Sequence, residues 1–542
     1  MMKPASQGQL ERSLSLALLP AVFLAVMLVA PVVRLLFEGG GGALRGTVAA
    51  LWQDDYLRWR MVWSFLQAAL TCLAALVLGL PVAWALARFE FAGRDVVLRL
   101  LMLPFVVPTL VAAIGVLALW GPRGLISSWL GFHLQDTPWL LLYGNLFFNL
   151  CVVVRAGVDA LEQVSASRVA AARTLGATPW RAFWRVEWPA IAPWLASALC
   201  LVFLYCFAGF GLALILGGQQ FATVEVEIYT LVAHELKLAE AGALAMCVML
   251  LTGGVALAYA VIEKHLATPA RADAIARKRP AGAFQWAVLV MALTVLFLVC
   301  AAPLLAVLLR VMAVGSEAWS VLTDDETLRA LWNTLRFTVS ALVLATVLGL
   351  THAMAARYSV WVRASAFLPF VASPVTVAFG LLLLYPRWTA SMTLLIAAYA
   401  LLAYPFVAKS LGSALDSLPA NLEQAASTLG ATPWRVFWRM TLPLVMPALR
   451  RGMAFAAATA LGEFAVSLFL SRPEWTTLTT LIYQRLGRPG AANLDAALVL
   501  ACLLMVLALA AFLIIENPFP RFGRYAVGKL ARQHDTMDTR HA

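Results

Sequence analysis

The apolar runs of this sequence constrain its fold more than any other feature, because they are long enough to cross a membrane as helices. Hydrophobic residues make up 62% of the 542 residues and charged residues 13%, against about 45–50% and about 25% in soluble domains. The surface of a soluble fold needs polar side chains, so no soluble fold could bury this apolar mass. In lipid, an α-helix satisfies its own backbone hydrogen bonds. We therefore expect an all-α polytopic membrane protein.

About twelve transmembrane helices are expected, at ~20 residues a span, with about six in each half of the chain. They fall near residues 14–37, 63–87, 98–120, 139–156, 191–217, 241–263, 284–312, 331–356, 364–386, 391–411, 446–470 and 494–515. No small-residue cleavage site follows the first run, so we interpret it as a retained helix. The seven cysteines lie in or beside apolar runs without a Cys-x-x-Cys spacing, which favours packing roles over disulfides or metal binding.

The chain is strongly basic, with a formal net charge of +12. Its Lys and Arg residues stand in short clusters between apolar runs, which is typical of cytoplasmic loops and argues against nucleic acid as a partner. With the N-terminus inside, most of the 40 basic residues fall on the cytoplasmic side, and the outer loops lean acidic, as at Glu225 and Glu227. We expect a multi-pass protein of the bacterial inner (plasma) membrane, in contact with lipid, with both termini in the cytoplasm.

Two segments of the chain are nearly the same. Residues 174–189 read TLGATPWRAFWRVEWP and residues 428–443 read TLGATPWRVFWRMTLP, with twelve of sixteen positions identical at an offset of 254 residues. Downstream, Tyr229 matches Tyr483 at the same offset. Trp, Pro, Arg and Gly do not recur in register by chance, so we interpret the chain as one half duplicated and fused.

The duplication sets the expected domain organisation. Upstream of the repeated segment, Gly115 matches Gly380 at an offset of 265 residues, and the order of the matches is preserved. Each half carries an even number of spans, so the two copies enter the membrane in the same orientation, as parallel six-helix repeats. We expect a first half at 1–263, a cytoplasmic linker at 264–282, a second half at 283–520 and a cytoplasmic tail at 521–542.

Each half repeats a cytoplasmic loop after its fourth span, at residues 157–190 and 412–445, here called the first and second repeated loops. In the first loop a helix is expected to stop at Gly176, in the left-handed conformation that glycine allows. Thr178 can cap the next helix, and Pro179 suits its first position. Pro189 is expected to break the chain before the next span. The second loop places the same roles on Gly430, Thr432, Pro433 and Pro443.

The short Trp- and Arg-rich helix in each loop has two interpretations. It could lie in the membrane interface, with Trp among the headgroups and Arg on phosphates. That interpretation does not explain why the glycine and the helix before it also recur. A docking element for a soluble partner explains all of these features.

The repeated loops resemble a signature of the permease subunits of binding-protein-dependent ABC importers. That cytoplasmic signature reads Glu-Ala-Ala, three residues, Gly, nine residues and Ile-x-Leu-Pro. The second loop matches this spacing with Gln424-Ala425-Ala426, Gly430 and Pro443. The first loop matches it with Ala170-Ala171-Ala172, Gly176 and Pro189. Both copies lack the signature Glu, and the first also lacks the Leu before its Pro.

The resemblance implies a type I importer permease fold, with each repeated loop a coupling helix on an ATPase. Two copies of a separate cytoplasmic ABC ATPase would dock on this chain, and a periplasmic or extracytoplasmic binding protein would deliver substrate for alternating access. The chain has no Gly-x-x-x-x-Gly-Lys-Ser/Thr phosphate loop. We therefore expect no enzyme activity and no cofactor in this chain, and ATP with Mg on the ATPase. The implied coupling residues are Ala170, Ala171, Ala172, Gly176, Pro179, Pro189, Gln424, Ala425, Ala426, Gly430, Pro433 and Pro443.

Within this family, the chain most resembles the fused permeases of thiamine and thiamine pyrophosphate importers. The resemblance lies in residues 52–57, WQDDYL, and residues 214–229, LILGGQQFATVEVEIY. Fused iron(III) permeases share the architecture and much of the signature, so iron(III) is the alternative substrate.

Glu463 is the candidate residue of the translocation path, because it falls within the expected eleventh span. An unpaired carboxylate in lipid is costly, so it should face the bundle interior or a water-filled path. A cationic substrate would suit it. The alternative is a structural carboxylate that is protonated or hydrogen-bonded between the halves.

Two other classes of protein fit the sequence less well. A secondary transporter of two like halves would show parallel repeats, but it would not need the glycine-centred loops. A membrane-embedded enzyme would need converging His, Asp or Glu in the spans, and the sequence has no His-x-x-x-His or His-Glu-x-x-His.

Overall fold

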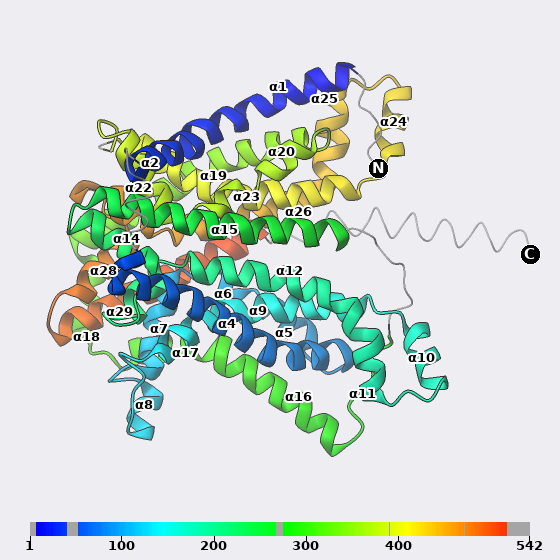
Figure 1. Cartoon of the computed structure of the whole chain (residues 1–542), viewed down its shortest axis with the longest axis horizontal. Coiled ribbons are helices and arrows are strands. Elements are labelled where there is room, and N and C mark those ends of the chain that lie inside the picture. The colour runs from blue at the N-terminus through cyan, green and yellow to red at the C-terminus, as the bar shows by residue number, and fades with distance from the viewer. Residues whose placement is uncertain (1–6, 41–51, 267–274, 390, 471, 517–542) are drawn as a thin grey trace, which may run out of the picture.

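The computed structural model describes residues 7–40, 52–266, 275–389, 391–470 and 472–516. These residues form helices and no strand, apart from one isolated β-bridge between Phe89 and Lys278. The long helices run along one common direction, and short helices gather at both ends of the bundle (Figure 1). The all-α expectation is confirmed. The expected tail at 521–542 and residues 267–274 of the expected linker lie outside the described residues.

The first half begins with one bent helix, which consists of α1 (Gln7–Leu24), the π-helical turn η1 (Ala25–Val29) and α2 (Ala30–Gly40). The helices that follow in this half are α4 (Asp55–Arg88), α5 (Arg94–Leu100), α6 (Leu103–Val106), α7 (Thr109–Trp120), α8 (Leu125–Leu130), α9 (Pro138–Glu162), α10 (Ala166–Thr174), α11 (Pro179–Ala182), η2 (Phe183–Glu187), α12 (Trp188–Phe207), α13 (Gly211–Leu216), α14 (Val224–Ala233) and α15 (Leu238–Leu266).

The second half repeats this order of elements. Its helices are α16 (Ala283–Leu296), η3 (Phe297–Ala301), α17 (Ala302–Ala313), α18 (Ser316–Trp319), η4 (Ser320–Thr323), α19 (Asp325–Ala356), α20 (Val360–Ser365), α21 (Leu368–Val371), α22 (Pro374–Leu384), α23 (Met392–Ser417), α24 (Ala420–Thr428), α25 (Pro433–Val436), η5 (Phe437–Thr441), α26 (Leu442–Leu461), α27 (Ala465–Leu470), η6 (Pro473–Trp475), α28 (Leu478–Gly487) and α29 (Ala491–Glu516).

The number of spans differs slightly from the expected twelve. Among the described residues, ten helices are long and apolar enough to cross a membrane, or eleven if Val360–Val371 and Pro374–Leu384 form one bent span. Helix α26 falls outside this count, although it occupies the place of α12 in the second half, and it carries Arg450 and Arg451. The expected spans at 191–217 and 446–470 were too long, because α12 ends at Phe207 and α26 ends at Leu461.

The first helix of each half packs against the other half. Helix α1 lies along α19, and α16 lies along α4, on opposite sides of the bundle (Figure 1). A glycine marks each crossing. A Cβ atom at Gly115 of α7 would lie 2.6 Å from the carbonyl oxygen of Pro303, and one at Gly380 of α22 would lie 2.9 Å from that of Pro31. The glycine pair found as a sequence match therefore lets two backbones approach closely in each half.

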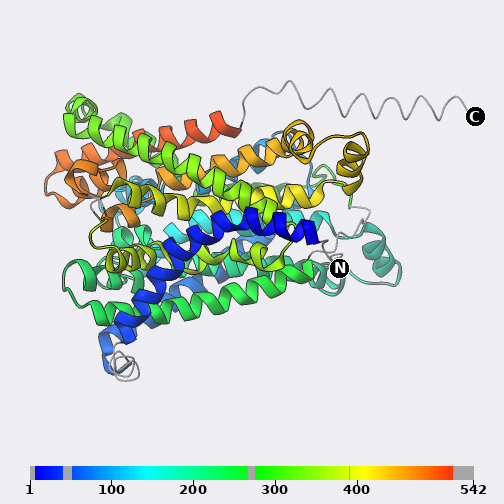
Figure 2. The same cartoon turned by 90° about the horizontal axis from the view of Figure 1, so that it is seen from above.

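Both repeated loops lie at one end of the bundle, here called the loop end. Helices α10 and α24 project there, α1 begins there, and α29 runs toward it (Figures 1 and 2). The short helices α8, α14 and α28 lie toward the opposite end (Figure 1). The division of the chain at 264–282 stays a prediction, since the exchanged first helices join the two halves into one packed unit.

We expect Gly115→Leu and Gly380→Leu each to destabilise the protein by at least ~1–3 kcal/mol, because the added side chain must displace a backbone carbonyl. The yield of monodisperse protein in detergent and the midpoint of its thermal unfolding measure this loss. Gly254→Leu on α15 is the matched control, since nothing lies within 4 Å of a Cβ atom there. Equal stability of all three variants would contradict the close-approach argument.

Candidate functional site

The first repeated loop has the local structure that its sequence predicts. Helix α10 begins after Ser165, whose hydroxyl accepts a hydrogen bond from the backbone N–H of Arg168 at 3.4 Å. Gly176 ends it with a φ of +85°, in the left-handed region. The hydroxyl of Thr178 then accepts from the N–H of Arg181 at 3.3 Å, and Pro179 occupies the first position of α11.

The second repeated loop has the same geometry. Gly430 has a φ of +78°, and the Thr432 hydroxyl accepts from the N–H of Arg435 at 3.4 Å, with Pro433 at the first position of α25. The N–H of Ala431 donates to the carbonyl of Ala426 at 3.1 Å, as the N–H of Ala177 does to Ala172 at 3.0 Å. These bonds satisfy the last carbonyls of each helix.

Pro189 and Pro443 do not break the chain, so that expectation was wrong. Residues Pro179–Phe207 form one continuous helical segment, in which the π-helical turn η2 joins α11 to α12. Pro189 is the second residue of α12, two residues after the end of η2. The turn η5 and Pro443 repeat this arrangement. Each loop is thereby joined rigidly to the fifth long helix of its half.

Each loop exposes large apolar side chains at the loop end. Leu175 and Leu429, which precede the left-handed glycines, are each 88% exposed, and Trp180 and Trp434 are each 70% exposed. The two Trp side chains rest edge-on against Trp184 and Trp438, with ring centroids 5.6 and 5.5 Å apart. Exposed apolar patches of this kind mark interaction sites.

The signature alanines take two different positions. Ala170, Ala171 and Ala425 are exposed, whereas Ala172 and Ala426 are half-buried where their carbonyls close the helix. Gln424 belongs to α24, and its side chain lies outside the described part of the chain.

A carboxylate braces each loop against the second long helix of its half. In the first half Glu187 of η2 pairs with Arg88 at the end of α4, at 2.5 Å. In the second half Glu423 of α24 pairs with Arg357 just after α19, through two bonds of 2.9 and 3.1 Å. Burial lowers the pKa of Arg357, but the hydrogen bonds and charge of Glu423 outweigh burial and raise that pKa above its ordinary value.

Both halves have this ion pair, but its carboxylate stands at a different position in each loop. The position equivalent to Glu187 is Thr441, whose hydroxyl donates to Glu423 at 3.4 Å. Both carboxylates thus reach an arginine at the end of the second long helix, from different positions in the loop. This brace was not predicted from the sequence, where its signal is Glu423, one position before the place of the missing signature Glu.

Glu463 lies at the break between α26 and α27, not inside a continuous span. It is buried, and its Oε1 accepts a hydrogen bond from the N–H of Val466 at 3.0 Å. The carboxyl therefore caps the start of α27. This hydrogen bond lies within the second half, and a role of Glu463 in the translocation path stays a prediction.

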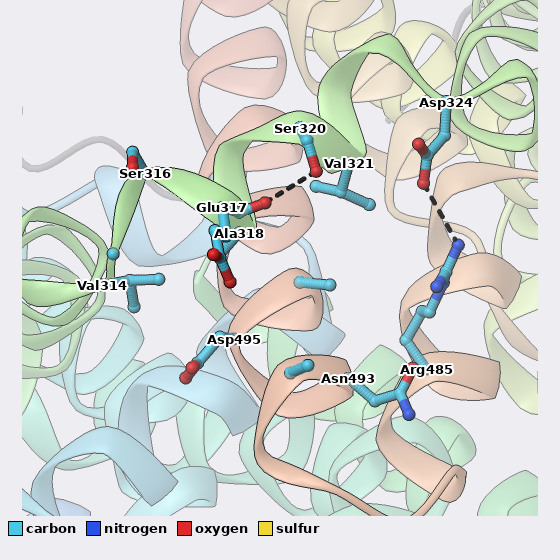
Figure 3. Close-up of a pocket in the computed structure, with 13 residues that line it drawn as sticks. Val314, Ser316, Glu317, Ala318, Ser320, Val321, Asp324, Arg485, Asn493 and Asp495 are labelled. Atoms are coloured by element: carbon cyan, nitrogen blue, oxygen red, sulfur yellow. Dashed lines mark hydrogen bonds and ion pairs between the residues drawn. The ribbon is translucent and has the colours of Figure 1, made fainter.

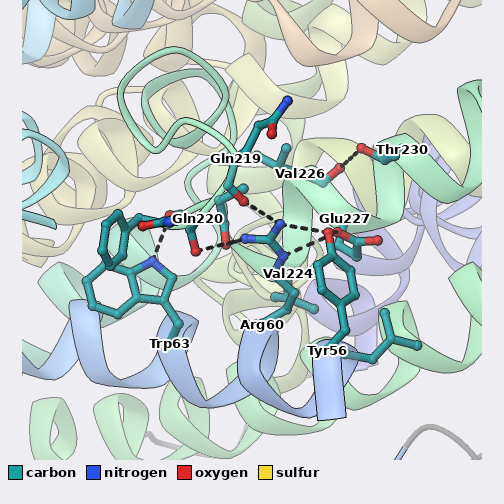
Figure 4. Close-up of polar contacts among 12 residues, drawn as sticks. Tyr56, Arg60, Trp63, Gln219, Gln220, Val224, Val226, Glu227 and Thr230 are labelled. Atoms are coloured by element: carbon teal, nitrogen blue, oxygen red, sulfur yellow. Dashed lines mark hydrogen bonds and ion pairs between the residues drawn. The ribbon is translucent and has the colours of Figure 1, made fainter. Parts of the chain in front are cut away.

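The two segments that carry the closer sequence resemblance meet away from the loop end. Tyr56 donates to Glu227 at 2.9 Å, and the buried Arg60 donates to the carbonyl of Gln219 at 2.6 Å and to that of Ala222 at 3.2 Å (Figure 4). The same guanidinium lies 3.4 Å from Glu227. Helix α4 thereby fixes the connection between α13 and α14. Residues 52–57 and 214–229 therefore lie in contact with each other.

A pocket of about 590 Å³ lies among α18, α28 and α29, away from the loop end (Figure 3). Asp324 and Arg485, which form an ion pair of 3.5 Å, stand on one side of it, and Glu317 and Asp495 on the other (Figure 3). Three carboxylates and one arginine thus line this surface, at the end of the bundle opposite the repeated loops (Figure 1).

Comparison with known proteins agrees with this architecture. The family described as "Binding-protein-dependent transport system inner membrane component" matches residues 75–268 and again residues 285–522. The thiamine transport system permease protein ThiP of Escherichia coli is 29% identical over 522 residues, which cover 92% of this chain and 96% of that protein. ThiP of Brucella suis is 30% identical over 529 residues, covering 92% and 94%. The sulfate transport system permease protein CysT of Escherichia coli is 34% identical over 146 residues, or 26% and 53%.

The double match confirms the duplication that was inferred from the repeated segments, and the matched ranges cover most of the chain. The chain therefore belongs to the family of binding-protein-dependent transport system inner membrane components, which are multi-pass permease subunits of ABC importers and are not catalytic by themselves.

Proposed function

We propose that this chain is the translocation subunit of an ATP-driven importer of thiamine or thiamine pyrophosphate. The observation that carries the proposal is similarity along 92% of the chain to permeases named for thiamine transport in several bacteria. Residues 52–57 and 214–229, which carry the resemblance to thiamine permeases, contact each other through Tyr56 and Glu227. The similarity to the sulfate permease covers only 26% of the chain.

Members of this family work with an ATPase and a binding protein. We place two copies of a separate cytoplasmic ABC ATPase on the two repeated loops, because these offer two matching exposed patches at one end of the bundle. ATP and Mg are bound by that ATPase, and this chain holds no cofactor. The loop end, with both termini, faces the cytoplasm, and the binding protein docks at the opposite face.

The loops can transmit motion because each is tied to two long helices. Helix α12 continues from α11 through η2, and the pair of Glu187 with Arg88 ties the same loop to α4. Closure of the ATPase dimer would draw the two loops together and move both helices in each half. ATP shifts this equilibrium only as far as it binds one state better than the other.

Substrate identity is tested by reconstituting the permease in vesicles with its ATPase and binding protein. We expect ATP-dependent uptake of labelled thiamine and no uptake of iron(III), because the relatives along the whole chain are thiamine permeases. Uptake of iron(III) without thiamine would overturn the substrate assignment. Thiamine uptake driven by an ion gradient without ATP would overturn the importer assignment itself.

Docking is tested by Gly176→Pro and Gly430→Pro. Proline fixes φ near −65°, so it cannot adopt the φ of +85° or +78° at these positions. We expect loss of ATPase co-purification with normal membrane insertion. Gly131→Pro is the matched control, because Gly131 ends α8 with a φ of +76° far from the loop end. Normal co-purification of the ATPase with both loop variants would contradict docking at the loops.

The braces are tested by Arg88→Gln and Arg357→Gln. Removing one partner of a buried ion pair costs ~3–5 kcal/mol, and an exposed pair costs far less. The side chains of Arg88 and Glu187 are 12% and 10% exposed, against 25% and 33% for Arg357 and Glu423. We therefore expect more ATP hydrolysed per thiamine transported in both variants, with the larger effect at Arg88. An unchanged ratio of ATP hydrolysed to thiamine transported would show that the braces do not couple the loops to transport.

A further inference from the structure

Four aromatic rings form a continuous row between the two halves. Phe210 and Phe464, which are equivalent positions of the repeat, stack on each other with centroids 5.8 Å apart and planes 23° apart. Each also packs against an equivalent tyrosine of its own half, Tyr229 at 5.5 Å and Tyr483 at 5.3 Å. A residue that touches its own repeat partner lies on the pseudo-twofold axis, so this row crosses the centre of the bundle.

The stacked phenylalanines stand where the fifth long helix of each half is interrupted. Phe210 lies between α12 and α13, and Phe464 lies between α26 and α27. Their exposed fractions are 4% and 2%, so both rings are buried where the two halves meet. Interrupted helices at a repeat interface are where transporters of other folds hold substrate.

A buried carboxyl on the same face has an unused oxygen. Glu225 precedes Tyr229 by one turn of α14, so the two side chains share a face of that helix. Glu225 is fully buried, and its Oε2 accepts a hydrogen bond from the Ser373 hydroxyl of the second half at 2.7 Å. Its Oε1 has no hydrogen-bond partner within the part of the chain that the structure describes. An unpaired polar atom in such a place is costly unless a ligand satisfies it.

The carboxyl breaks the symmetry of an otherwise symmetric row. The position equivalent to Glu225 is Thr479, whose hydroxyl donates to the carbonyl of Glu463 at 3.1 Å. Glu463 itself is committed to capping α27. Among the described residues, the centre of the bundle therefore offers two matching aromatic rings and one carboxyl oxygen without a hydrogen-bond partner.

We infer that this row and Glu225 form a transit site for an aromatic cation inside the permease. The flat ring of the cation enters between Phe210 and Phe464 when the halves separate, and the carboxyl of Glu225 pairs with its charge. Aromatic faces attract both flat rings and cations, and one carboxyl suits a single positive charge. The inference rests on the proposed function, since thiamine carries an aromatic ring and a cationic ring.

The site is tested by thiamine transport in vesicles that contain the complete transporter. We expect Glu225→Gln, and the double variant Phe210→Leu with Phe464→Leu, each to lower the transport rate tenfold or more. Their ATPase activity with thiamine-loaded binding protein should stay within twofold of the unsubstituted protein. Phe464→Tyr, which keeps an aromatic ring, should retain most of the transport.

Two controls separate recognition from packing. Phe207→Leu removes an equally buried ring that stacks on Phe203 of its own helix, with centroids 5.7 Å apart. Glu235→Gln removes a carboxylate that pairs with Lys237 near the surface. Both should transport thiamine within twofold of the unsubstituted protein. If Phe207→Leu and the double variant lose transport equally, the aromatic row has only a packing role. That result would overturn the inference.

The outcomes also separate this inference from the proposed function. If the unsubstituted protein transports thiamine and the site variants match it, only the transit site is wrong. If the unsubstituted protein does not transport thiamine, the substrate assignment fails. If the double variant leaks thiamine without ATP while its ATP-driven rate is unchanged, the rings are a gate without a binding role, and the inference is overturned.

Discussion

The exchange of first helices between the halves is the contact on which the rest of the structure depends. Helix α17 crosses α7 at Gly115, and α2 crosses α22 at Gly380, each with a proline carbonyl against the glycine. Without a hydrophobic driving force between helices in lipid, such close backbone packing is a main source of helix association. The two halves are therefore held together at two crossings with closely packed backbones.

The two halves are alike in their repeated loops and differ at the centre of the bundle. The left-handed glycines, the threonine caps and the π-helical turns recur in both loops. An ion pair to the end of the second long helix recurs in both halves, although Glu187 and Glu423 occupy different positions in their loops. At the centre the symmetry ends, since the position of Glu225 in the first half is taken by Thr479 in the second.

The structure could be predicted from the sequence where local chemistry decides it. Helix length in lipid and the φ of glycine are local properties, so the all-α fold and the ends at Gly176 and Gly430 could be predicted. Prediction failed where one helix continues through a π-helical turn, as at Pro189, and where an apolar run contains a break, as at Glu463. Apolar composition does not record such breaks, because both sides of the break remain buried.

The sequence by itself determined the membrane setting, the duplication, the two repeated loops and the family signature, because each is written in composition or in spacing along the chain. Only the tertiary structure decided which carboxyl groups are buried and which partners they have. Glu225 looked like part of an acidic outer loop, yet it is fully buried against Ser373, 148 residues away. Burial and pairing depend on contacts between elements that are far apart in the sequence. The sequence alone does not say which of these elements meet in space.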